Sequence, residues 1–102
     1  MATDLTTLNW ENGGNNYKQA GVGAATAIEI KLPKWAKLVT IQPTAQALLF
    51  SYEGTDGVAL STHAFPQAVD SIIQYNPVQT SQDRSIFIQS QSGTSIVYFI
   101  FE

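Results

Sequence analysis

Ser95-Ile96-Val97-Tyr98-Phe99-Ile100-Phe101-Glu102 is a run of β-branched and aromatic residues, the composition typical of a β-strand. Because side chains alternate along a strand, the odd-numbered residues from 97 to 101 share one face and the even-numbered residues from 96 to 100 share the other. Both faces are apolar, whereas a strand with one face in water alternates apolar with polar residues. We therefore predict that this strand is covered on both sides, by the core on one side and by a loop, a second subunit or a larger assembly on the other.

Shorter apolar runs precede this stretch, spaced about ten residues apart and separated by turn-forming residues. They lie at residues 27–32, 35–42, 46–52, 71–75 and 84–89, and a weaker one lies at residues 3–10. None has a convincing helical period. The pattern predicts an all-β fold, a single antiparallel β-sandwich (jelly-roll-like) of about seven or eight short strands. Its inward-facing positions are expected to include Ile28, Ile30, Val39, Ile41, Ile72, Ile86 and Ile88.

The chain is expected to form one domain, residues 1–102, because no internal linker divides it. Residues 1–24 are predicted to form an N-terminal arm and a glycine-rich loop, in which residues 3–10 are either a first edge strand or an arm that lies on another subunit. Residues 58–69 are predicted to form a long loop over one end of the sandwich. Ser90-Gln91-Ser92-Gly93 has the length and the final glycine of a four-residue hairpin loop. We therefore predict that it joins residues 84–89 to the closing strand as an antiparallel pair.

The surface is expected to be sparsely charged. The formal net charge is -3 and the charged fraction is 13%, about half of the ~25% typical of globular proteins. Five basic residues are too few for a nucleic-acid face, the apolar runs are too short to span a bilayer, and the N-terminus lacks the regions of a signal peptide. We expect no nucleic-acid or membrane partner, synthesis in the cytoplasm, and a surface that tolerates close packing against other proteins.

Catalytic signatures are weak. His63 is the only histidine, and a triad of Ser61 or Ser71 with His63 and Asp70 lacks any G-x-S-x-G motif. Glu53 and Asp56 share one glycine-flanked turn, where carboxylates usually cap or solvate the turn. With one histidine and no cysteine, a zinc site is improbable. We therefore expect a protein that is not an enzyme and that has no catalytic, metal-binding or cofactor-binding residues.

Aromatic side chains are the remaining candidates for a binding site. As anchors of protein interfaces, Trp10 and Tyr17 are expected at a subunit contact together with the apolar face of the closing strand. The predicted oligomer contacts are therefore Trp10, Tyr17, Val97, Phe99 and Phe101. As an alternative, aromatic rings can stack on sugars while polar neighbours bind the hydroxyls, and the candidate glycan contacts are Trp35, Tyr52, Asp56 and His63.

Two stretches carry a resemblance to a known class of proteins. The first runs from Glu29 to Pro43, with the sequence Glu-Ile-Lys-Leu-Pro-Lys-Trp-Ala-Lys-Leu-Val-Thr-Ile-Gln-Pro, and the second runs from Ser85 through Gly93 to Val97. Both resemble small β-sandwich, jelly-roll-like proteins of tailed-bacteriophage virions, which serve as head decoration (cement) subunits, fibres, or neck and tail adaptors. The resemblance covers about three quarters of the chain, and its motifs are structural.

The resemblance implies a non-enzymatic structural virion protein. A capsid decoration subunit of this kind would stabilise the head through contacts with copies of itself, commonly as a trimer, and with a major capsid protein. Its expected location is the virion, after synthesis in the host cytoplasm. The alternative is a carbohydrate- or receptor-binding module of a phage fibre or tail, whose partner would be a surface glycan.

Overall fold

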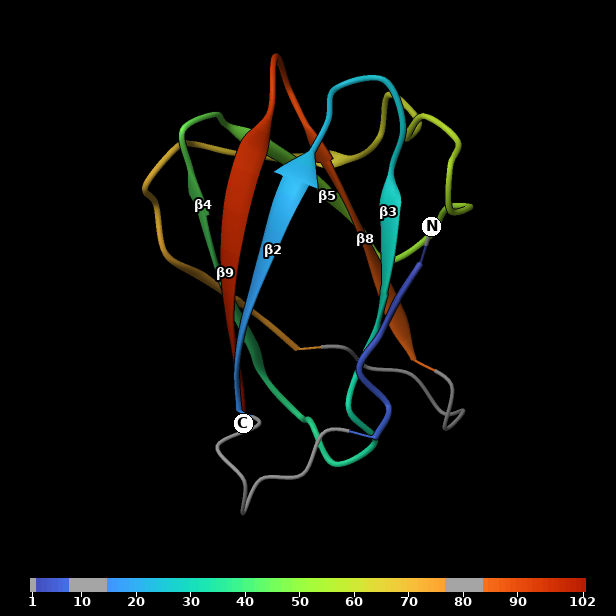
Figure 1. The fold of residues 1–102 in the computed structure, drawn as a ribbon, viewed down its shortest axis with the longest axis vertical. Coiled ribbons are helices and arrows are strands. Elements are labelled where there is room, and N and C mark those ends of the chain that lie inside the picture. Colours follow the sequence, from blue (N-terminus) through green and yellow to red (C-terminus); the bar gives the residue numbers. More distant parts are fainter. Residues whose placement is uncertain (1, 8–14, 77–83) are drawn as a thin grey trace.

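The computed structural model describes residues 2–7, 15–76 and 84–102 of the chain. In these parts, nine β-strands form two sheets that pack face to face (Figure 1). One sheet has the order β1-β3-β8-β5-β6 and the other has the order β2-β9-β4-β7. The strands are β1 (Thr3–Asp4), β2 (Asn16–Val22), β3 (Ile28–Lys31), β4 (Val39–Thr44), β5 (Leu48–Ser51), β6 (Phe65–Gln67), β7 (Ile73–Tyr75), β8 (Ser85–Ser90) and β9 (Ser95–Phe101).

The strand order has the topology of a jelly roll. From β2 to β9, consecutive strands fall in opposite sheets, with the single exception of β5 and β6, which are adjacent in one sheet. All pairings are antiparallel except that of β1 with β3. The predicted all-β antiparallel sandwich is therefore confirmed, with nine strands in the described residues where seven or eight were expected.

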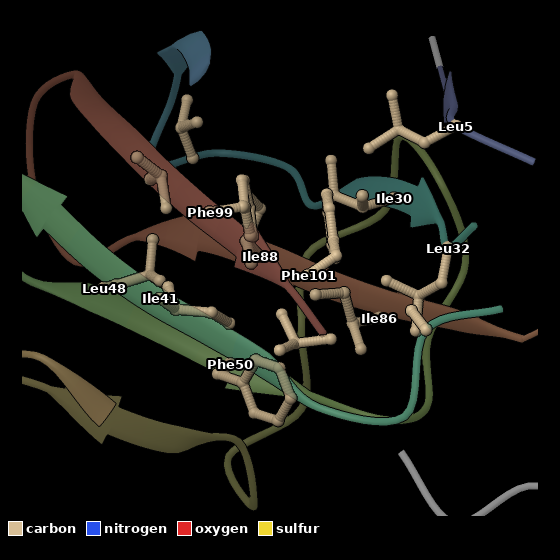
Figure 2. Close-up of a cluster of buried hydrophobic side chains, with 14 residues drawn as sticks. Leu5, Ile30, Leu32, Ile41, Leu48, Phe50, Ile86, Ile88, Phe99 and Phe101 are labelled. Atoms are coloured by element: carbon tan, nitrogen blue, oxygen red, sulfur yellow. The ribbon is translucent and has the colours of Figure 1, made fainter. Parts of the chain in front are cut away.

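The core lies between the two sheets and is built from alternate residues of their strands (Figure 2). Of the predicted inward positions, Ile28 is half-buried and Ile72 is 66% exposed, and the other five are fully buried. The prediction for Ile72 was wrong because β7 begins only at Ile73, and Ile73 pairs with Ile41 and Tyr75 with Val39. The buried apolar cluster comprises Leu5, Val22, Ile30, Leu32, Ala36, Val39, Ile41, Leu48, Phe50, Ile86, Ile88, Val97, Phe99 and Phe101.

The strand that is covered on both faces is β8, and not β9. In β9, residues 97, 99 and 101 are at most 1% exposed, while Tyr98 and Ile100 are each 43% exposed. In β8 the outward-facing Phe87 and Gln89 are only 7% exposed, because the chain between β5 and β6 lies over them. The amide of Gln89 accepts a hydrogen bond from the backbone N–H of Leu60 and donates one to the carbonyl of Ala24, both at 2.8 Å.

The connection between β8 and β9 crosses from one sheet to the other, so the predicted hairpin was wrong. Its ends are bound to the chain between β4 and β5 instead. Gln91 donates its backbone N–H to the Ala47 carbonyl at 2.9 Å, and Ser95 donates its hydroxyl to the carbonyls of Thr44 and Gln46 at 2.9 and 3.1 Å. A four-residue polar connection with glycine is therefore compatible with an arch between sheets as well as with a hairpin.

Of the two N-terminal alternatives, the edge strand is the one found in the described residues, and only the predicted loop was wrong. Thr3–Asp4 forms β1 beside β3, and Leu5 is buried in the core of the same molecule. Asn16–Val22, predicted as part of a loop, is the seven-residue strand β2. Its glycine is accommodated by a shift in register between Gln19 and Val22, where Gly21 has a φ of 71° that a residue without a Cβ adopts at low cost.

Gln67 joins the two sheets at the β6–β7 side of the sandwich. Its side chain is 1% exposed, and its Nε2 donates to the carbonyls of Ile41 at 2.8 Å and Ser71 at 3.3 Å. Its Oε1 accepts a hydrogen bond from the hydroxyl of Tyr75 at 3.2 Å. All three partners belong to the other sheet or to the connection that leads into it.

Replacing this amide should therefore leave buried polar groups without partners. We expect Gln67→Leu to lower the free energy of unfolding by about 1–3 kcal/mol, measured by urea denaturation. Gln74→Leu is the matched control, because the Gln74 side chain is exposed and donates only to Thr40 Oγ1 at 3.4 Å. The control should change stability by no more than about 0.5 kcal/mol. Equal effects of the two substitutions would contradict the role of Gln67.

Candidate functional site

Exposed apolar side chains gather in two regions of the described chain. Tyr98 and Ile100 lie on β9, in the middle of the sheet β2-β9-β4-β7. The other five are spread over residues 58–73, which contain β6 and the connections on either side of it. These five are Val58, Phe65, Val69, Ile72 and Ile73.

The outer surface of the sheet β2-β9-β4-β7 surrounds Tyr98 and Ile100 with polar residues. Directly paired residues of adjacent strands share a face. Tyr98 is paired with Lys18 and Gln42, and Ile100 is paired with Asn16 and Thr40. Lys18 is the only charged residue of this set. We call the set the outer β9 face, and its members are Asn16, Lys18, Thr40, Gln42, Thr44, Gln74, Ile96, Tyr98 and Ile100.

A shallow hollow of about 450 Å³ lies on the outer β9 face. Tyr98 and Ile100 line it together with Asn16, Lys18 and Gln42. The centre of this face is thus apolar, its rim is polar, and part of it is concave. That distribution is typical of the centre and rim of a protein–protein interface.

Three of the five predicted oligomer contacts are core residues and not surface residues. Val97, Phe99 and Phe101 are core residues with exposed fractions of 0, 1 and 0%, so their side chains are not at the surface. Tyr17 is half-buried, with its ring centroid 6.2 Å from that of Phe99, and its hydroxyl donates to Gln19 Oε1 at 3.0 Å. Trp10 lies outside the described residues.

Sequence reasoning missed Tyr98 and Ile100 as the exposed apolar residues of β9. The alternation along the strand was correct, but both faces are apolar and neither is marked as inner or outer. The neighbouring strands carry the missing signal. Lys18 and Gln42 pair with Tyr98, so the polar residues of β2 and β4 identify its face as the outer one once the pairing is known.

A second hollow, of about 480 Å³, lies beside β5 and under the connection from β5 to β6. It brings together two of the four predicted glycan contacts, Tyr52 and His63. The Tyr52 ring is held edge-on against Phe50, with centroids 5.0 Å apart, and its hydroxyl donates to the Asn76 carbonyl at 3.2 Å. Partial burial raises the pKa of the Tyr52 hydroxyl above its ordinary value.

The other two predicted glycan contacts do not line this hollow. Trp35 is half-buried and packs against the core cluster. Asp56 lies in the turn after β5 and accepts the backbone N–H of Glu29 on Oδ1 at 2.9 Å. Next to it, Gly57 donates to the Ala27 carbonyl at 2.9 Å. Asp56 therefore helps to fasten this turn to β3.

Acid should weaken this fastening. The hydrogen bond from Glu29 lowers the pKa of Asp56 below the ordinary aspartate value of 3.8. A carboxyl group with a lowered pKa in the folded state stabilises the fold above its unfolded pKa, and this contribution is lost as the pH falls through the folded pKa. We expect the stability advantage of the wild type over Asp56→Asn to shrink below about pH 4.

At pH 7 we expect Asp56→Ala to lower the free energy of unfolding by about 1 kcal/mol, because the Glu29 N–H loses its acceptor. Asp56→Asn should cost less, since its amide oxygen can still accept. Thermal and urea unfolding of both variants from pH 7 to pH 2.5 measure these effects. A constant difference between wild type and Asp56→Asn across this range would contradict the assignment.

A third hollow, of about 380 Å³, is lined by both acidic and basic residues. It lies at the β1 edge of the sheet β1-β3-β8-β5-β6. Asp4 accepts the backbone N–H and the hydroxyl of Thr6 at 2.9 and 2.6 Å, and these hydrogen bonds lower the pKa of its carboxyl group. Glu29 accepts the Ser85 hydroxyl at 2.7 Å. Lys31 and Lys34 also line the hollow, so its lining contains both acidic and basic side chains.

The remaining chemical candidates are engaged in turns. Ser61 Oγ accepts the backbone N–H of His63 at 3.2 Å, and the Ser71 hydroxyl donates to the Ala68 carbonyl at 2.6 Å. In residues 2–7, 15–76 and 84–102, no group of three or more Asp, Glu or His side chains is placed to hold a metal ion. The same residues contain no helix long and apolar enough to cross a bilayer.

Comparisons with known proteins did not identify a relative of this chain. No family model, no curated protein and no solved structure matches this chain.

Proposed function

We propose that this protein is a non-enzymatic structural subunit of a tailed-phage virion, and that it decorates the capsid. In this role it associates with copies of itself, as a trimer or a similar small oligomer, and with the major capsid protein. The work of such a subunit is to occupy a fixed position and to hold its neighbours in place.

The outer β9 face carries the proposal. Tyr98 and Ile100 are each 43% exposed in a four-stranded sheet, and Lys18 is the only charged residue among those paired with them on the neighbouring strands. Interface centres are enriched in aromatic residues and depleted of charge. Burial of this face in an assembly would remove the apolar surface from water and would leave Lys18 near the rim.

Two further observations support the virion part of the proposal. Residues 29–43 and 85–97 resemble virion β-sandwich proteins, and they include most of β3 and β4, and β8 with the start of β9. The jelly-roll topology is common among viral capsid domains, although lectin domains and enzymes also use it. The fold is therefore compatible with the role, and the exposed face gives the specific reason for it.

The proposal is tested by purifying the phage particles whose genome encodes this chain. Mass spectrometry of these particles would then be searched for peptides of the chain. We expect a fixed and high copy number relative to the major capsid protein. Particles that lack the subunit should rebind the purified wild type in a co-sedimentation assay and should fail to bind Ile100→Lys. Particles without the chain, and without affinity for it, would contradict the proposal.

A further inference from the structure

The hollow beside β5 has walls that are fixed before any ligand arrives. Gly54 packs against the Phe87 ring so closely that a Cβ there would lie 3.1 Å from the ring. Further along the same connection, the backbone N–H of Leu60 is held by Gln89 at 2.8 Å, and the Val58 carbonyl accepts the N–H of Ala27 at 3.1 Å. The connection is thus bound to both β8 and β3, so a ligand need not order it on binding.

One wall of the hollow is aromatic and partly uncovered. Phe65 is 61% exposed and pairs with the buried Phe50 on the adjacent strand. Phe50 in turn stacks on Tyr75, with centroids 3.8 Å apart, and holds Tyr52 edge-on. The exposed Phe65 therefore lies on the strand next to an aromatic cluster of Phe50, Tyr52 and Tyr75, whose rings are packed against one another.

The lining of the hollow also carries polar groups. Ser51, Glu53, Thr55, Ser61 and His63 supply hydroxyl, carboxylate and imidazole groups, and among the described residues no Lys or Arg lines the hollow. A ligand for this site needs an apolar face for the rings, several hydroxyls for the polar groups, and no negative charge near Glu53. The volume of about 480 Å³ lies in the range of roughly 300–1,000 Å³ that small-molecule sites occupy.

We propose that this hollow binds a neutral saccharide, with one sugar ring on Phe65 and its hydroxyls facing Ser61, His63 and Glu53. Sugars have this combination of a C–H face and a hydroxyl edge. The site is distinct from the outer β9 face, because it belongs to the other sheet and its lining shares no residue with that face. A subunit held in an assembly by the outer β9 face can therefore still present this hollow to a glycan.

An NMR titration tests the site on the complete chain. The probes are glucose, galactose, mannose and N-acetylglucosamine with their short oligomers. Glucuronate is the control, because it is the negatively charged counterpart of glucose. We expect at least one neutral saccharide to shift the amide signals of residues 51–65 in a saturable way. Glucuronate should bind more weakly than glucose, because no lining cation offsets its repulsion by Glu53.

Variants separate binding at this site from binding elsewhere. Phe65→Ala should weaken binding of that saccharide about tenfold, since it removes the exposed ring, and His63→Ala should weaken it less. Ile72→Ala is the matched control, because Ile72 is exposed to a similar extent, 66%, and does not line the hollow. Thermal unfolding confirms that each variant is folded.

Three results would overturn the proposal. The first is the absence of saturable shifts in residues 51–65 with every saccharide probe. The second is unchanged affinity in a folded Phe65→Ala variant. The third is binding of cyclohexane methanol, a ring without the full set of hydroxyls, as tightly as the best saccharide.

Discussion

Phe99→Ala is expected to lower the free energy of unfolding by about 3–5 kcal/mol. Phe99 is 1% exposed, and its ring centroid lies 5.8 Å from that of Phe101 and 6.2 Å from that of Tyr17. Truncation would remove buried apolar surface and leave a cavity beneath β9, whose backbone is fixed by its ladders with β2 and β4. Urea unfolding, followed by intrinsic fluorescence, measures the loss.

Tyr98→Ala is the matched control on the same strand. Tyr98 points to the outer β9 face and is 43% exposed, so its truncation should cost the isolated subunit about 1 kcal/mol or less. Both variants should be compared at protein concentrations low enough that association does not add to stability. Equal losses for the two variants would mean that the inner and outer faces of β9 are assigned incorrectly.

If the protein forms the proposed oligomer, Ile100→Lys is expected to dissociate it and to leave a folded subunit. The substitution places a cation at the centre of the outer β9 face, diagonal to Lys18, where burial would leave it without a partner. We expect at least a hundredfold rise in the dissociation constant, which corresponds to about 3 kcal/mol per contact. Lysine is preferred to aspartate here because a carboxylate could pair with Lys18 and mask the effect.

Val58→Lys is the control for this experiment. Val58 is 54% exposed and lies in the connection from β5 to β6, on the sheet that does not contain β9. A charge there should therefore leave the oligomer intact. Sedimentation velocity gives the mass of each variant, and circular dichroism shows whether it is folded. A folded Ile100→Lys variant with the mass of the wild-type oligomer would exclude the outer β9 face as the contact.

The sheet architecture could be predicted from the sequence because several runs alternate clearly. In β3, β4 and β8, the predicted inward residues Ile30, Ile41 and Ile86 are fully buried. Alternation failed where a strand has apolar residues on both faces. In β8 and β9 the pattern alone does not reveal that Phe87 is covered by a loop while Tyr98 is open, since that difference depends on chain far away in sequence.

Connections were predicted less well than strands, for a related reason. The segment Ser90–Gly93 satisfies the local rules of a hairpin, yet the jelly roll requires β8 and β9 to lie in different sheets. Gly21 and its neighbours suggested a loop, although a local shift in register accommodates the glycine within β2. In both cases the pairing partner, and not the local composition, decides the outcome.

The residues of the candidate sites could be predicted only in part from the sequence. Tyr52 and His63 were identified as aromatic and polar candidates, and the structure places both at one hollow. Phe65 was not identified, because its exposure follows from its position on the edge strand β6 next to Phe50. Asp56 was identified as a ligand contact, whereas its carboxylate holds a turn to β3.

Assembly through the outer β9 face is the proposed way in which this chain works. Sedimentation equilibrium of the wild-type protein over a wide range of concentrations tests it most directly. A subunit of 11.1 kDa that assembles should sediment as a defined multiple of that mass, and Ile100→Lys should reduce the mass to 11.1 kDa. A wild-type protein that remains at 11.1 kDa at every concentration, including in the presence of purified capsids, would contradict the account.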